Sequence, residues 1–172
     1  YKIKLLAISK FDGESVEMRV HPAMTPFSDQ LSNVDGTLNA VTVSGDAVGD
    51  MMLFGHGAGM FPTASAVLSD TVDIARSILA GGGVRVPVLS YQMDHIRSIP
   101  VRPIDDIESH YYFRFSAVDR PGVLSKIAGI LGEHDISIKY VHQLERKTNG
   151  GVPVFMLSHL AKEAQVRKAF EK

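Results

Sequence analysis

The 172-residue sequence contains no cysteine and no tryptophan, and its formal charge is only −1. Without cysteine there can be neither a disulfide framework nor a thiolate metal site. The near-neutral charge argues against nucleic acid or an anionic membrane surface as a partner, because binding to either depends on an excess of basic residues. No apolar run approaches the length of a membrane span, so we expect no membrane partner and a cytoplasmic location.

Two kinds of motif are also absent. The seven histidines show no H-x-x-H or H-E-x-x-H spacing, so we predict no metal site. Neither G-x-G-x-x-G after a strand nor G-x-x-x-x-G-K-[ST] occurs, so the sequence carries no nucleotide fingerprint. The content of hydrophobic residues (45%) and charged residues (22%) is nevertheless typical of a soluble globular protein, so a folded domain is expected.

The most distinctive stretch is 51–79, which predicts a strand, a glycine-rich turn and a helix. Three glycines within residues 55–59 indicate a backbone with positive φ, or one that another group approaches closely. Either Pro62 as the first helical residue or Thr63 as the N-cap would start the helix. Backbone N–H groups at such a start suit phosphates and carboxylates. The alternative is a tight turn that only lets the strand and the helix pack together.

The rest of the first half is rich in strands. Four are predicted, at residues 3–9, 16–20, 38–44 and 48–54. The first two form a hairpin that ends at His21-Pro22, and apolar and charged residues alternate in its second strand as in a half-buried strand. The last two form a hairpin around a loop that contains glycine. Between the hairpins, residues 26–34 predict a short helical turn capped by Ser28.

The pattern changes near residue 105. Residues 84–107 contain three prolines without a helical period, which predicts an extended linker with one short strand or helical turn near 91–97. From His110 onward the pattern predicts the order strand, helix, strand, strand, helix, with a hairpin turn at 148–151. A ferredoxin-like βαββαβ unit would need one more strand.

Recognisable motifs extend this interpretation. Residues 55–70, GHGAGMFPTASAVLSD, resemble the G-x-G-A-G…PTA-x-x-V-x-x-D block near the end of the catalytic domain of homoserine dehydrogenase. The preceding residues 34–59 are also similar to that family, as are the stretches IKLLAISK and VHPAMTPFSDQL. The resemblance implies that the glycine loop faces the cofactor side of the enzyme's cleft. The residues concerned are Gly55, Gly57, Ala58 and Gly59.

Residues 119–138, DRPGVLSKIAGILGEHDISI, resemble an ACT domain, a small amino-acid-binding module. The resemblance implies that an effector binds at Asp119, Gly122, Val123 and Gln143. N–H groups at the helix start would hold the carboxylate of the effector, and Asp119 would pair with its ammonium group. Two alternatives stay open: Asp119 is only a helix N-cap, and Gln143, with His142, makes contacts across a dimer.

Together the resemblances imply an α+β fold, in which a mixed or antiparallel sheet with covering helices is followed by a ferredoxin-like βαββα(β) ACT domain. We predict that residues 1–84 form the C-terminal part of the catalytic and dimerisation domain. Residues 85–107 would be a linker, and residues 108–172 the ACT domain without its last strand.

The implied activity is interconversion of L-homoserine and L-aspartate semialdehyde with NAD or NADP, under feedback control by an amino acid, with threonine as the expected effector. The family's catalytic lysine and substrate-binding acidic residues would precede Tyr1. We therefore expect no catalytic residue here, no cofactor bound to this chain alone, and no activity without the preceding part. A homodimer or higher oligomer is expected. The alternative is a stand-alone amino-acid sensor and dimerisation protein without catalysis.

Overall fold

The computed structural model describes residues 1–82, 91–144 and 151–171. The chain divides into two compact units, one made of residues 1–4 and 22–98 and the other of residues 5–21 and 99–172. We describe each unit by itself and call residues 107–171 of the second unit the C-terminal module. The predicted boundaries at residues 84 and 107 stay predictions.

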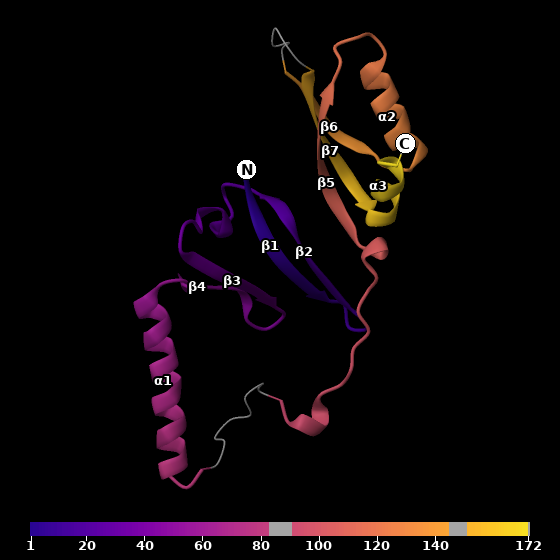
Figure 1. The fold of residues 1–172 in the computed structure, drawn as a ribbon. Coiled ribbons are helices and arrows are strands. Elements are labelled where there is room, and N and C mark those ends of the chain that lie inside the picture. The colour runs from indigo at the N-terminus through magenta and orange to yellow at the C-terminus, as the bar shows by residue number, and fades with distance from the viewer. Residues whose placement is uncertain (83–90, 145–150, 172) are drawn as a thin grey trace. The chain divides into compact units, whose positions relative to one another are not determined.

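Strands β1 (Lys2–Phe11) and β2 (Val16–Thr25) pair in a two-stranded sheet (Figure 1). The carboxylate of Asp12 shapes the connecting turn by accepting hydrogen bonds from the N–H groups of Glu14 (3.0 Å) and Ser15 (2.7 Å). The hairpin does not end at His21-Pro22 as predicted, because β2 continues to Thr25. Each strand of a two-stranded sheet has an open edge, where a proline without an N–H is tolerated.

In β2 the charged side chains are buried and the apolar side chains are exposed, which is the reverse of the usual arrangement in a strand of alternating apolar and charged residues. Glu17 is 6% exposed and the side chain of Arg19 is 9% exposed, whereas Met18 and Val20 are 53% and 68% exposed. The strand is half-buried, as predicted, but its charged face is the covered one.

A short 3₁₀ turn, Gln30–Asn33, replaces the helical turn predicted at 26–34. Its cap is Asp29, whose carboxylate accepts from the N–H of Leu31 at 2.9 Å, so the predicted Ser28 cap is wrong. Aspartate and serine are both favoured caps, and here the turn begins one residue later.

The second predicted hairpin is confirmed. Strands β3 (Leu38–Gly45) and β4 (Gly49–His56) are antiparallel. The register places Val41 opposite Leu53 and Val43 opposite Met51, so these four side chains share one face. All four are exposed.

Helix α1 (Met60–Leu79) follows the glycine loop and has no buried residue. Its C-cap is Ala80, after which Gly81 and Gly82 adopt positive φ, as glycines that follow a helix commonly do. Gly83, the third glycine of this run, lies outside the described residues. Within the predicted linker, the described part contains two 3₁₀ turns, Met93–His95 and Ile104–Asp106.

The C-terminal module has the predicted βαββα order. Its elements are β5 (Glu108–Ala117), α2 (Val123–Glu133), β6 (Ile138–Gln143), β7 (Val152–Lys162) and α3 (Glu163–Ala169). The strands are antiparallel in the order β5-β7-β6, and the two helices cover one face of the sheet (Figure 1). Most of the hairpin turn predicted at 148–151 lies outside the described residues.

Every buried hydrophobic side chain in the described part of the chain belongs to residues 107–169. The core cluster combines strand residues such as Phe113 and Met156 with Leu131 from α2 and Val166 from α3. The predicted α+β class is confirmed, and the C-terminal module has a hydrophobic core of its own.

Candidate functional site

The glycine loop connects β4 to α1, and its glycines serve different purposes. Gly55 is still part of β4, opposite Asn39, with open space where a Cβ would lie. At Gly57 the side chain of Asn39 fills that space, so this is the expected close approach, made within the chain. Gly59 has φ = 128°, a conformation that favours glycine. These roles account for Gly57 and Gly59 through the local packing of strand and helix.

Helix α1 starts earlier than predicted. Gly59 is its N-cap, without a side-chain hydrogen bond to the first turn, and the N–H of Thr63 donates to the carbonyl of Gly59 at 3.1 Å. Pro62 is therefore the third helical residue and Thr63 lies inside the helix, so both predicted starts are wrong. The first-turn N–H groups of a helix have no partner inside the helix, so proline is tolerated throughout that turn.

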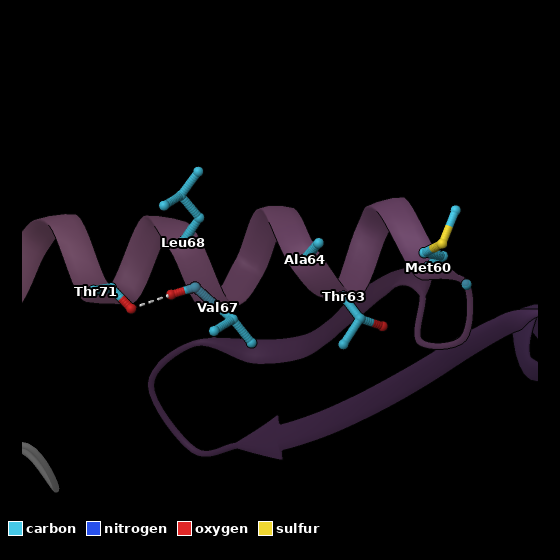
Figure 2. Close-up of a pocket in the computed structure, with 7 residues that line it drawn as sticks. Met60, Thr63, Ala64, Val67, Leu68 and Thr71 are labelled. Carbon is cyan, nitrogen blue, oxygen red and sulfur yellow. Dashed lines mark hydrogen bonds between the residues drawn. The ribbon is translucent and has the colours of Figure 1, made fainter.

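One face of α1 borders a shallow apolar depression (Figure 2). Its lining consists of Gly59, Met60, Thr63, Ala64, Val67, Leu68 and Thr71. The Thr71 hydroxyl is engaged locally, donating to the carbonyl of Val67 at 2.7 Å. The depression contains no charged side chain, so nothing there would hold a pyrophosphate beyond the backbone N–H groups of the helix start. The loop therefore fits, at most, one edge of a dinucleotide site.

Other polar residues near the loop have local partners. The ring of His56 lies 2.8 Å from the Thr37 hydroxyl, and Asp50 accepts from the Ser44 hydroxyl at 2.6 Å. Asp46 accepts from the N–H of Ala47 within the β3–β4 turn. In the described part of the chain, no group of three or more histidine and acidic side chains could hold a metal ion.

The second candidate site is a cavity of about 340 Å³ at the end of the C-terminal module where β5 leads into α2. Asp119, Gly122, Val123 and Gln143, the four residues predicted for the effector, all line it. A volume of this size lies at the lower end of the range for small-molecule sites, roughly 300–1,000 Å³. The structure thus brings the predicted residues together around one space.

The N-cap of α2 is Gly122, with φ = 90°, and no side chain caps the helix. The alternative that Asp119 is only an N-cap is therefore wrong, since Asp119 lies three residues before the cap. Its carboxylate stays available at the cavity beside the helix N-terminus, where the partial positive charge of the helix also favours an anion. A zwitterionic α-amino acid has an ammonium group that suits the Asp119 carboxylate and a carboxylate that suits the N-terminus of α2.

Sequence reasoning missed several residues of the cavity wall. The additional lining residues are Ala117, Val118, Arg120, Pro121, Leu124 and Val154. Arg120 could have been predicted, because it lies inside the D-R-P-G turn at residues 119–122 and supplies a cation that can pair with a carboxylate. Val154 could not have been predicted, because only the β6–β7 register places it opposite Gln143.

Family models match both halves of the chain. A homoserine dehydrogenase model matches residues 1–72, and an ACT domain model matches residues 111–172. The chain is therefore similar to the homoserine dehydrogenase family. The resemblance proposed from residues 55–70 and 119–138, to a C-terminal part of that family, is confirmed.

Curated proteins similar to this chain are also homoserine dehydrogenases. Homoserine dehydrogenase of Pseudomonas aeruginosa is 41% identical over 170 residues, which is 98% of this chain and 39% of the relative. That of Neisseria gonorrhoeae is 40% identical over 169 residues, with the same shares. The chain therefore spans about 39% of the length of these relatives.

Solved structures give the same result. The crystal structure of a homoserine dehydrogenase from Thiobacillus denitrificans matches 99% of this chain and 38% of its own, with 42% identity and a TM-score of 0.83. Staphylococcus aureus homoserine dehydrogenase matches with 23% identity and a TM-score of 0.58, a likeness that concerns the fold alone. None of the described helices has the length and apolarity needed to cross a membrane.

Proposed function

We propose that this chain supplies the C-terminal part of an NAD- or NADP-dependent oxidoreductase that interconverts L-homoserine and L-aspartate semialdehyde. Similarity to homoserine dehydrogenases over 98% of this chain is the observation that supports this reaction. The chain's own contribution to the reaction is structural. In the longer enzyme, the loop Gly55–Gly59 lies at the cofactor side of the cleft, and the nicotinamide cofactor supplies the hydride chemistry.

The regulatory part of the proposal is that the cavity at 117–124 binds an α-amino acid, with threonine as the effector. The Asp119 carboxylate pairs with the ammonium group of the ligand, and the start of α2 with Arg120 holds its carboxylate. The positive φ of Gly122 lets the backbone turn at the cavity wall. The observation that carries this proposal is the convergence of these groups on one cavity.

The exposed apolar faces support an oligomer. The face formed by Val41, Val43, Met51 and Leu53 is uncovered, and so is every side chain of α1. Contiguous exposed apolar surfaces of this kind mark interaction sites. We propose a homodimer or higher oligomer in a cytoplasmic enzyme of amino-acid biosynthesis.

The deciding experiment is a calorimetric titration of the chain with threonine, using isoleucine and methionine as controls, together with an assay of NAD(P) reduction by homoserine. We expect saturable threonine binding at millimolar or lower concentration and no turnover by this chain alone. Turnover would contradict the assignment of the catalytic groups to another segment. Amino-acid binding by a longer protein that lacks dehydrogenase activity would favour the alternative, a sensor without catalysis.

A further inference from the structure

In the part of the C-terminal module that the structure describes, one face of the sheet carries no helix. Helices α2 and α3 cover the face that holds Phe113 and Met156 (Figure 1). Because side chains alternate along a strand, the residues next to these lie on the open face. The pairing register brings six of them together in two rows across β5, β7 and β6. We call these six residues the plate: Tyr112, Leu157 and Tyr140 in one row, and Arg114, Phe155 and His142 in the other.

The side chains of the plate lie against one another. Tyr112 and His142, from the two outer strands, both stack on Phe155, with ring centres 6.1 and 6.4 Å from its own. Tyr140 stacks on His142 at 6.3 Å. The guanidinium carbon of Arg114 lies 5.9 Å from the centre of the Phe155 ring, within the range of a cation–π contact. These contacts hold the side chains in one arrangement before any partner binds, which lowers the cost of ordering them on binding.

The plate is nevertheless open to solvent. Tyr112 is 39% exposed and Tyr140 is 53% exposed, and Arg114 and His142 are exposed as well. Aromatic residues and arginine are enriched at protein–protein interfaces relative to the rest of the surface, and they supply most of the strongest contacts there. An ordered and exposed cluster of this composition therefore indicates an interface with another protein surface.

The charge of the plate indicates which surface fits it. None of its six residues is acidic, and Glu108, the acidic residue of β5, lies opposite Lys162 at the other end of that strand. A complementary surface must offer ring faces to Arg114 and flat apolar groups to the rings. The plate itself offers both, so a second copy complements it without any carboxylate. Because Arg114 lies on an outer strand, two copies that face each other along β7 keep their arginines roughly 10 Å apart, which is two strand spacings.

We propose that the plate is a self-association surface, at which the open sheet face of one copy packs on the open sheet face of a second copy. The two-fold axis runs along β7, so β5 of each copy lies over β6 of the other. Each Arg114 then meets the ring of His142 across the interface, and the row of Tyr112 faces its own equivalent. The plate is separate from the β3–β4 face and from α1, and this inference rests neither on the proposed reaction nor on amino-acid binding.

The first test is sedimentation velocity on the full chain over a wide range of concentration. Arg114→Glu places a carboxylate against the ring faces and should weaken the association of plates by about tenfold or more, so the weight-average mass falls towards half that of wild type. Lys126→Glu makes the same change of charge on the exposed side of α2 and should leave the mass unchanged. Arg114→Lys keeps the charge without the planar guanidinium and should fall between them. Equal masses for wild type and a folded Arg114→Glu would overturn the proposal.

The second test uses the absence of cysteine, because a single introduced thiol then reports contact between copies directly. Leu157 lies on β7 beside the proposed axis, where equivalent residues of two copies face each other. Packed sheets lie about 10 Å apart, so a short bismaleimide, rather than a disulfide, should join two copies of Leu157→Cys. Lys126→Cys should stay uncrosslinked. An associated but uncrosslinked Leu157→Cys would overturn the proposal and assign the oligomer to other exposed faces, and a wild-type chain that stays monomeric would assign the plate to a different partner.

Discussion

The side-chain amide of Asn39 occupies the space that a Cβ at residue 57 would need. Gly57→Ala should therefore destabilise the β3–β4 hairpin by about 1–2 kcal/mol, because Asn39 must rotate away from its contact with the Thr37 carbonyl. Amide exchange in 38–45 and 49–56 reports this local stability. Gly55→Ala is the matched control, because nothing lies near its Cβ position.

A second substitution isolates the cause. In the Gly57→Ala background, Asn39→Ala removes the obstructing amide and should recover most of the lost stability. If Gly55→Ala and Gly57→Ala are equally destabilising, or if Asn39→Ala gives no recovery, then close approach is not the reason for glycine at residue 57.

The effector site gives a prediction about affinity. Asp119→Ala should weaken threonine binding by about one to two orders of magnitude, the value of a charge-assisted hydrogen bond. Because the N-cap of α2 is Gly122, the midpoint of thermal unfolding should hardly change. Asp106→Ala, which removes an exposed carboxylate outside the cavity lining, is the control and should leave affinity unchanged. A large fall in the unfolding midpoint for Asp119→Ala would indicate a structural role instead.

Two glycines of the C-terminal module should respond to alanine in opposite directions. Gly122 has φ = 90°, so Gly122→Ala should destabilise the module by about 1–3 kcal/mol. Gly129 lies inside α2 with nothing near its Cβ position, so Gly129→Ala should stabilise by about 0.5–1 kcal/mol. Urea unfolding measures both. Destabilisation by Gly129→Ala would mean that the helix packs there against another surface.

Features set by residues close together in the sequence could be predicted, whereas features set by pairing between distant residues could not. The βαββα order and the β3–β4 hairpin follow from local periodicity and turn residues, and both were predicted. The cavity residues Asp119, Gly122, Val123 and Gln143 were predicted from the resemblance to an ACT domain, whose recognisable turn contains three of them. Val154 was not, because its position depends on pairing across the sheet.

The charged face of β2 shows a different limit. Alternation of apolar and charged residues indicates that a strand has two unlike faces, and the usual inference is that the apolar one is covered. In β2 the opposite holds, because Glu17 and the side chain of Arg19 are the covered groups. No local pattern in the sequence distinguishes this arrangement from the usual one.

The turn between β1 and β2 should be sensitive to acid. Hydrogen bonds from the N–H groups of Ser15 and Glu14 lower the pKa of Asp12 to about 2 from 3.8, with a smaller contribution from Arg102. A lowered folded pKa gives stability that is present above pH 3.8 and lost as the pH falls towards 2. Asp12→Asn should therefore reduce stability at neutral pH, and the difference from wild type should shrink below pH 3.8.

Urea unfolding of both proteins at intervals between about pH 2 and pH 6 measures this difference. Asp106→Asn, an exposed carboxylate away from the turn, serves as the control. A difference between wild type and Asp12→Asn that stays constant over this range would contradict the pKa shift as its cause.

The loss of stability at alkaline pH should depend on the Tyr111 hydroxyl. Burial, and then the hydrogen bond to the Glu163 carboxylate, raise the pKa of the Tyr111 hydroxyl above its ordinary value of 10.0. Above that pH the unfolded chain loses the phenolic proton before the folded chain does, so the folded state binds more protons and stability falls as the pH rises. The contribution of Tyr111 is therefore complete below pH 10.0 and lost above it.

Tyr111→Phe should be less stable than wild type at neutral pH, by about 1 kcal/mol for one partly exposed hydrogen bond. Above about pH 10 its stability should fall less steeply, so that the two unfolding curves converge. Tyr112→Phe is the matched control, since Tyr112 stacks on Phe155, and it should keep the wild-type alkaline slope. If Tyr111→Phe and wild type lose stability in parallel between about pH 9 and pH 11, Tyr111 does not hold its proton in the way the structure requires.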